Sequence, residues 1–174
     1  MNHTELGLLI ARNCYKEDTY TPWGSRAISF DRRILSTNPA LLDEIAHHLI
    51  KLLPNDISLL IGNANGGVPL TQAFRRNIQI PITILQKDDQ NNLVVGHCNE
   101  YRGWVATLVD DTLCKGSRIV EASNLLNQLG ITIKNVLCVI ARGTIGIANL
   151  RERNITTLSL FTGEELARYR SKNI

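Results

Sequence analysis

The chain has 174 residues, of which 44% are hydrophobic and 20% are charged, as is ordinary for a globular protein. This length allows one domain with a hydrophobic core that buries roughly 70% of the surface of the unfolded chain. The formal net charge is only +3 and no cluster of Lys and Arg stands out, which argues against nucleic-acid binding but suits an anionic small-molecule substrate.

The sequence gives no signal for export, membrane insertion or disulfide bonding. No run reaches about 18 apolar residues, and the first residues lack the basic and apolar regions of a signal peptide. The four cysteines are scattered, without a CxxC pair or a partner histidine pair at zinc-finger spacing. We therefore expect a cytoplasmic protein with reduced thiols, no membrane association and no zinc site.

The hydrophobic pattern alternates between strand and helix along the chain. Asn38-Pro39 predicts a helix start, because Asn caps helices and proline favours the first helical position. Thr162-Gly-Glu-Glu165 has the spacing of a capping box and predicts the start of a final helix. The helices are expected at 4–14, 39–53, 68–76, 117–129, within 143–153 and from 162, and the strands at 27–30, 57–61, 80–85, 104–109, 136–141 and 156–160, with a short hairpin around 93–95.

This alternation predicts an α/β fold with a central, mainly parallel, five-stranded sheet flanked by helices. No internal repeat, low-complexity run or second domain is evident, so we expect residues 1–174 to form a single domain. The stretch 86–103 is polar and long for a connection, and loops of that length are usually functional or disordered.

The segment from Val105 to Ser117 has the pattern of an anion-binding turn. An apolar run ends in two adjacent carboxylates, Asp110 and Asp111, and a short loop with one glycine leads into a helix that begins near Ser117. The backbone N–H groups of about 112–117 would gather at the positive end of that helix, where phosphate binds. Ribose hydroxyls could donate to the carboxylates, so a sugar phosphate fits. The alternative is an ordinary strand-to-helix turn capped by Asp.

A second glycine-rich turn lies between 59 and 70, in Leu-Leu-Ile-Gly-Asn-Ala-Asn-Gly-Gly-Val-Pro-Leu. It also follows an apolar strand and opens a helix. We expect Gly66 and Gly67 to allow positive φ and a close approach of the backbone to a ligand. Two such turns after successive strands are stronger evidence for a phosphate-ester ligand than either turn alone.

The first motif resembles the phosphoribosyl-pyrophosphate (PRPP) signature of type I phosphoribosyltransferases, most of all the orotate version, and the second resembles their pyrophosphate loop, Gly-Pro-Ala-Tyr-Lys-Gly-Ile-Pro. Gly62, Ala64 and Gly67 match that loop, whereas Gly66 stands where the family has Lys. Weaker resemblances follow in family order: 24–30 to the N-terminal segment that covers the base, 86–96 to the mobile catalytic loop, 138–142 to the strand end whose Arg meets orotate, and 159–166 to the closing strand and helix.

The resemblance implies a small N-terminal hood at about 1–37, a core at about 38–174, and a site built from both turns. It implies Lys87, Asp110 and Asp111 as catalytic residues, Mg²⁺ that enters with PRPP and needs no protein ligands, and a homodimer. It also implies base-binding residues Arg142, Phe30 and Cys114. The PRPP-binding residues that it implies are Asp110, Asp111, Thr112, Leu113, Cys114, Lys115, Gly116, Ser117, Gly66 and Gly67.

Each single residue also has a plainer interpretation. Lys87 could be a solvated loop lysine, Arg142 a surface charge at a strand end, and Phe30 a core aromatic. The function that the resemblance implies is transfer of the phosphoribosyl group from PRPP to a base, orotate first. The alternatives are a PRPP- or nucleotide-binding regulator without activity, a transferase for another base such as a purine, and an unrelated α/β binding domain.

Overall fold

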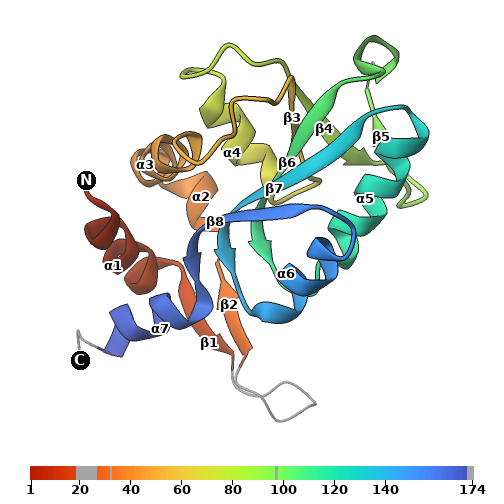
Figure 1. Cartoon of the computed structure of the whole chain (residues 1–174). Coiled ribbons are helices and arrows are strands. Elements are labelled where there is room, and N and C mark those ends of the chain that lie inside the picture. Colours follow the sequence, from red (N-terminus) through yellow and green to blue (C-terminus); the bar gives the residue numbers. More distant parts are fainter. Residues whose placement is uncertain (19–26, 32, 97, 172–174) are drawn as a thin grey trace.

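One sheet runs through the middle of the molecule, with helices on both of its faces (Figure 1). The computed structural model describes residues 1–18, 27–31, 33–96 and 98–171. Within these residues the sheet has six strands in the order β5-β4-β3-β6-β7-β8, and all neighbours are parallel except β4 and β5. The strands are β3 (Leu59–Gly62), β4 (Ile82–Lys87), β5 (Leu93–Val95), β6 (Val105–Leu113), β7 (Thr132–Ala141) and β8 (Thr156–Thr162).

The predicted α/β class and mainly parallel sheet are confirmed, although the sheet has six strands where five were expected. The additional strand is β5, which the sequence predicted as part of a short hairpin around 93–95. It pairs antiparallel with the end of β4, with Lys87 opposite Leu93. Half of the long polar stretch after β4 is therefore an ordered hairpin at the sheet edge.

The sheet reverses its winding at β3. From β3 the chain crosses to β4 on one side, and after β5 it returns to β6 on the other side of β3. In open α/β sheets, ligands bind in the crevice beyond the carboxyl ends of the strands at such a switch point. The loops after β3 and β6 carry the two glycine-containing motifs, so the fold brings both motifs to one crevice.

Two hydrophobic cores lie on opposite faces of the sheet, because successive side chains of a strand point to opposite sides. Leu60 of β3 belongs to one core, and its neighbours Leu59 and Ile61 belong to the other. The first core is covered by α1 (His3–Asn13), α3 (Pro39–Ile50), α4 (Gly67–Phe74) and α7 (Gly163–Ser171), and the second by α5 (Ser117–Gln128) and α6 (Thr144–Arg151).

The N-terminal part adds a two-stranded antiparallel ribbon that is separate from the main sheet. The ribbon pairs β1 (Tyr15–Asp18) with β2 (Ala27–Phe30), and the short helix α2 (Arg33–Thr37) follows it. The remaining short element, the 3₁₀ helix η1 (Cys98–Tyr101), precedes β6. Residues 24–26, which the resemblance places in the hood segment, lie outside the described residues.

Two helix starts confirm the capping signals in the sequence. The Asn38 side chain accepts a hydrogen bond from the Leu41 backbone N–H at 3.1 Å, with proline at the first helical position of α3. At α7 the Glu165 backbone N–H donates to the Thr162 hydroxyl, and the Glu165 carboxylate accepts from the Thr162 backbone N–H at 2.7 Å. These bonds satisfy N–H groups that a helix start leaves without a partner.

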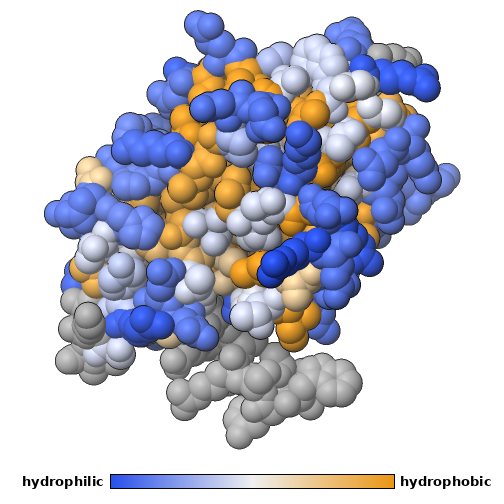
Figure 2. Space-filling view, viewed as in Figure 1, coloured by the Kyte–Doolittle hydropathy of each residue, from blue (hydrophilic) through white to orange (hydrophobic). Residues whose placement is uncertain are grey.

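The described surface and thiols agree with a globular protein. Hydrophilic residues cover much of the face seen in Figure 2, and apolar residues are visible between them. None of the helices in the described ranges is both long and apolar enough to span a bilayer.

Cys14 and Cys138 are buried free thiols whose pKa values are raised by burial, and Cys114 is an exposed free thiol.

Candidate active site

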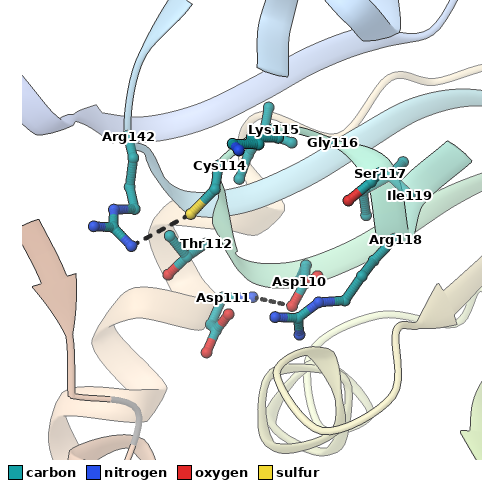
Figure 3. A pocket seen from close by; sticks show the side chains of 11 residues that line it. Asp110, Asp111, Thr112, Cys114, Lys115, Gly116, Ser117, Arg118, Ile119 and Arg142 are labelled. Atoms are coloured by element: carbon teal, nitrogen blue, oxygen red, sulfur yellow. Dashed lines mark hydrogen bonds between the residues drawn. The ribbon is translucent and has the colours of Figure 1, made fainter. Parts of the chain in front are cut away.

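The predicted phosphate loop forms one wall of an open cleft at the carboxyl end of β6. All eight residues from Asp110 to Ser117 line this cleft, which has a volume of about 410 Å³. Arg118 and Ile119 of α5 and Arg142 after β7 complete its lining (Figure 3). The structure thus brings together the predicted PRPP loop, which includes the predicted base-binding residue Cys114, and a second predicted base-binding residue, Arg142.

The two carboxylates lie within β6, whereas the sequence predicted that the strand would end at Val109. Pairing with β7 continues to Leu113, which lies opposite Ala141. On its other side β6 pairs with β3 only as far as Gly62 opposite Val109. Asp110 and Asp111 therefore extend beyond the end of β3 while β7 still holds their backbone in place.

Asp110 is fixed by hydrogen bonds from two directions. The Asn63 side-chain amide donates to Asp110 Oδ2 at 2.7 Å. The Asp111 backbone N–H donates to Asp110 Oδ1 at 2.8 Å, as drawn in Figure 3. Asp110 and Asp111 are buried, with 7% and 8% of their surfaces exposed. Asn63 follows β3, so this bond ties the first motif to the second across 47 positions of sequence.

Burial, together with the neighbouring Asp111 charge, raises the pKa of Asp110 to about 7. The hydrogen bonds from Asn63 and from the Asp111 backbone act in the opposite direction, because they stabilise the ionised carboxylate. Near neutral pH Asp110 therefore changes between its neutral and its ionised form, and its ionised oxygens can accept hydrogen bonds from hydroxyl groups of a sugar.

The start of α5 provides the anion-binding geometry expected from the sequence. Gly116 precedes the helix with φ of 79°, a left-handed conformation that favours glycine, and no side chain caps the helix. Uncapped N–H groups at a helix start attract an anion. Cys114 and Lys115 are exposed beside them, whereas the side chain of Leu113 is buried in the core, so Leu113 can contribute only its backbone.

Helix α6 supports this loop from behind, which the sequence did not predict. The Asn149 side-chain amide donates to the Lys115 carbonyl at 2.9 Å. Gly146 packs so closely on the Cys114 carbonyl that a Cβ atom at position 146 would collide with it. The loop is therefore held by a helix that begins about 30 residues later in the chain.

The turn after β3 differs from its predicted backbone conformation. The positive φ lies at Asn65, at 71°, whereas Gly66 has φ of −73°. The Gly66 N–H donates to the Ala64 carbonyl and the Gly67 N–H to the Asn63 carbonyl, so neither is free to face pyrophosphate in this conformation. The expectation of positive φ at the two glycines was wrong, because the side-chain-bearing Asn65 takes that position.

The two glycines instead allow close packing of α4 on the end of β6, and the predicted close approach of their backbone to a ligand stays a prediction. A Cβ atom at Gly66 would collide with Asp110 Oδ1 and lie 2.6 Å from Asp111 Oδ1. A Cβ atom at Gly67 would collide with the Val109 carbonyl oxygen. The first turn of α4 can therefore press against the end of β6 only if both positions lack side chains.

Arg142 lies directly after β7 and reaches the phosphate loop. Its backbone N–H donates to the Leu113 carbonyl at 2.8 Å, and its guanidinium Nη1 donates to Cys114 Sγ at 3.4 Å (Figure 3). These contacts place a cation and a thiol on the same wall of the cleft. Phe30 is part of β2, but its side chain lies outside the described parts of the structure.

Lys87 lines a second, smaller hollow of about 100 Å³ rather than the main cleft. It ends β4, is exposed, and donates from Nζ to Asn91 Oδ1 at 2.7 Å. Arg118 lines both the hollow and the main cleft, so the two spaces adjoin at this side chain. The hollow is lined by Asn63, Ala64, Asn65, Lys87, Leu93, Arg118 and Glu121.

Three functional candidates were missing from the sequence analysis: Asn63, Arg118 and Asn149. Asn63 lies within the second motif and Arg118 directly follows the first, and their polarity was the only available signal. Their contacts depend on which strands are neighbours. Asn149 belongs to α6, a helix that the sequence predicted but that carried no functional motif. No protein-family model matches the chain.

Curated proteins of similar sequence carry phosphoribosyltransferase names. The chain is 32% identical to an orotate phosphoribosyltransferase of Thermoplasma volcanium over 127 residues, which cover 71% of this chain and 74% of that protein. It is also 26% identical to a hypoxanthine/guanine phosphoribosyltransferase of Methanosarcina acetivorans over 141 residues, covering 73% and 74% of the two chains.

Solved structures share the fold over nearly the whole chain. The orotate phosphoribosyltransferase of Aeropyrum pernix superposes with a TM-score of 0.81 at 20% identity, covering 97% of this chain and 99% of that one. The Mycobacterium tuberculosis orotate phosphoribosyltransferase in complex with PRPP gives a TM-score of 0.76 at 18% identity, covering 95% and 98%. The Thermoplasma volcanium protein is 32% identical over most of both chains, and the similarity to orotate phosphoribosyltransferases extends to the solved folds. The chain therefore belongs to the type I phosphoribosyltransferase family and is a phosphoribosyltransferase.

Proposed function

We propose that this enzyme transfers the phosphoribosyl group of PRPP to orotate, giving the nucleoside monophosphate and pyrophosphate. The observation that carries the proposal is the pairing of the buried Asp110–Asp111 carboxylates with the uncapped start of α5 in one cleft. A phosphate at the helix start and ribose hydroxyls on the carboxylates would together orient a sugar phosphate. A curated relative named orotate phosphoribosyltransferase and a similar fold solved with PRPP support it.

In this proposal residues 112–117 hold the 5′-phosphate, and Asp110 and Asp111 accept hydrogen bonds from the ribose hydroxyls. A bond forms between the base nitrogen and ribose C1 as the bond from C1 to the pyrophosphate oxygen breaks, through a transition state with oxocarbenium character. Positive charge then develops on the ribose beside the two carboxylates. The contribution of the protein is orientation and electrostatic stabilisation.

Orotate is the proposed base because Arg142 places a guanidinium in the cleft. A planar guanidinium binds a carboxylate through two parallel hydrogen bonds, and orotate carries a carboxylate that purine bases lack. Cys114, in contact with Arg142, and Phe30 are the other proposed base-binding residues. The hypoxanthine/guanine phosphoribosyltransferase relative makes a purine the second candidate.

We also propose that Mg²⁺ enters with PRPP and that the enzyme works as a homodimer. Mg²⁺ prefers oxygen ligands, retains several waters and commonly binds through substrate phosphates. The carboxylate oxygens of Asp110 and Asp111 in the cleft suit the waters that the ion would retain, so no protein ligand is needed, and the ion would neutralise charge on the pyrophosphate. The homodimer stays a prediction from the resemblance.

The proposal is tested by pyrophosphate release from Mg-PRPP in the presence of orotate, uracil, adenine, guanine or hypoxanthine. We expect release with orotate, and none from the double variant Asp110→Asn/Asp111→Asn. Release with a purine alone would identify the second candidate. Silence with every base, in protein that still binds PRPP by calorimetry, would contradict transfer to any base of the panel.

Lys87→Ala is expected to reduce the rate of pyrophosphate release at least about 100-fold, as loss of a group that stabilises developing charge often does. Binding of PRPP should weaken much less, because the phosphate loop and the carboxylates remain. Single-turnover release and calorimetry measure the two effects separately. Lys51→Ala, at an exposed position after α3, is the matched control. Equal rates for Lys87→Ala and the wild type would mean that Lys87 is a solvated loop lysine.

A further inference from the structure

Arg118 is a positively charged residue of the cleft, and its guanidinium has no hydrogen-bond or ion-pair partner among the described residues. Its side chain extends from the first turn of α5 toward the Asp110–Asp111 pair in Figure 3. Within the described residues its guanidinium makes neither a hydrogen bond nor an ion pair, although two buried carboxylates face the same cleft. An exposed guanidinium at such a place is available to an anionic ligand.

The position of Arg118 connects the two spaces of the site. It lines the main cleft with the phosphate loop, and it lines the smaller hollow with Lys87 and the turn at Asn63–Asn65. The hollow also contains Glu121, one turn further along α5. The three charged residues that line the hollow, Lys87, Arg118 and Glu121, therefore have a formal net charge of +1. Without Arg118 this net charge would be zero.

The turn after β3 cannot supply a cation of its own. Any side chain at position 66 would begin with a Cβ atom that collides with Asp110 Oδ1. That oxygen cannot move away easily, because it is buried and accepts the Asp111 backbone N–H. Within the described lining of the hollow, the positive charges are therefore Lys87 and Arg118.

We infer that Arg118 binds the pyrophosphate group of PRPP, together with Lys87, in the hollow beside the main cleft. This inference rests on the proposed phosphoribosyl transfer. The 5′-phosphate belongs to the loop at 112–117 at the start of α5, whereas the hollow lies on the side of the turn after β3. Although Arg118 lines both spaces, we expect its guanidinium to contact the pyrophosphate end of PRPP, while the loop at 112–117 holds the 5′-phosphate end.

The experiment compares two ligands that each carry one end of PRPP. Calorimetry measures binding of inorganic pyrophosphate and of ribose 5-phosphate, both with Mg²⁺, to the wild type, Arg118→Gln and Arg118→Lys. We expect Arg118→Gln to weaken pyrophosphate binding roughly tenfold or more, the usual effect of losing a charge-assisted hydrogen bond. Ribose 5-phosphate binding should change less than about twofold, and Arg118→Lys should recover part of the loss.

Arg151→Gln is the matched control, because Arg151 is an exposed arginine of α6 that lines neither space. It should leave both affinities unchanged. Unchanged pyrophosphate binding in Arg118→Gln, equal weakening of both ligands, or a wild type that binds no pyrophosphate would each overturn the inference. Because binding is measured without turnover, selective loss in Arg118→Gln would support it even if no base in the panel reacted.

Discussion

Asp110→Asn is expected to lower kcat/KM for PRPP at least about 100-fold while increasing the free energy of unfolding at pH 8. The substitution keeps the shape of the side chain and can keep the hydrogen bond from Asn63, but it removes a charge that is buried beside Asp111. Buried like charges destabilise a fold, so a site that must hold two carboxylates together reduces stability for the sake of ligand binding.

The raised pKa of Asp110 explains why Asp110→Asn should increase the free energy of unfolding at pH 8. The pKa of Asp110 is raised to about 7 in the folded protein, against roughly 3.9 for an unfolded aspartate. Between these values the folded state binds more protons than the unfolded state, so stability falls as the pH rises from about 4 to about 7. Asp110→Asn should lack this component of the fall, and the wild-type kcat/KM for PRPP should rise through about pH 7 as Asp110 ionises.

Urea unfolding at about pH 5 and about pH 8, with a pH–rate profile of the wild type, measures both effects. Asp56→Asn is the control, because Asp56 is exposed and its ion pair with Lys134, at 3.3 Å, is of a kind that contributes little to stability. If Asp110→Asn and the wild type lost the same free energy of unfolding between the two pH values, Asp110 would not carry the raised pKa.

Gly67→Ala is expected to destabilise the fold by about 2–4 kcal/mol, the effect of forcing an atom into a packed backbone contact. A Cβ atom at this position would collide with the Val109 carbonyl oxygen and lie 3.1 Å from the Gly62 carbonyl carbon. Both obstacles are backbone atoms of paired strands, so relief requires α4 to move away from the sheet. The expected decrease in Tm is about 5–10 °C.

Gly143→Ala is the matched control for Gly67→Ala. Gly143 precedes α6 in an extended conformation, with φ of −178°, and a Cβ atom there would meet no heavy atom within 4 Å. Its Tm should therefore stay within about 2 °C of the wild-type value. Thermal unfolding followed by circular dichroism measures both variants, and equal Tm values for the two would contradict the close packing of α4 on β6.

Much of the fold followed from local patterns in the sequence. The strands at 82–87 and 93–95 and the helices that begin at Pro39 and Ser117 lie close to where hydrophobic periodicity and capping residues predicted them. Such signals act within about four residues, so a single sequence contains them completely. The length of β6 was misjudged because strand pairing with β7, a non-local interaction, keeps Asp110 and Asp111 in the strand.

The sequence by itself determined which chemical groups the site contains: an acidic pair, a glycine-containing loop at a helix start, and a second glycine-rich turn. Tertiary structure decided how they act. The winding of the sheet makes β3 and β6 neighbours, and that pairing gives Asn63 its bond to Asp110 and Gly66 its contact with the carboxylates. Contacts between residues 47 positions apart depend on strand order and packing, to which a local pattern of residues is insensitive.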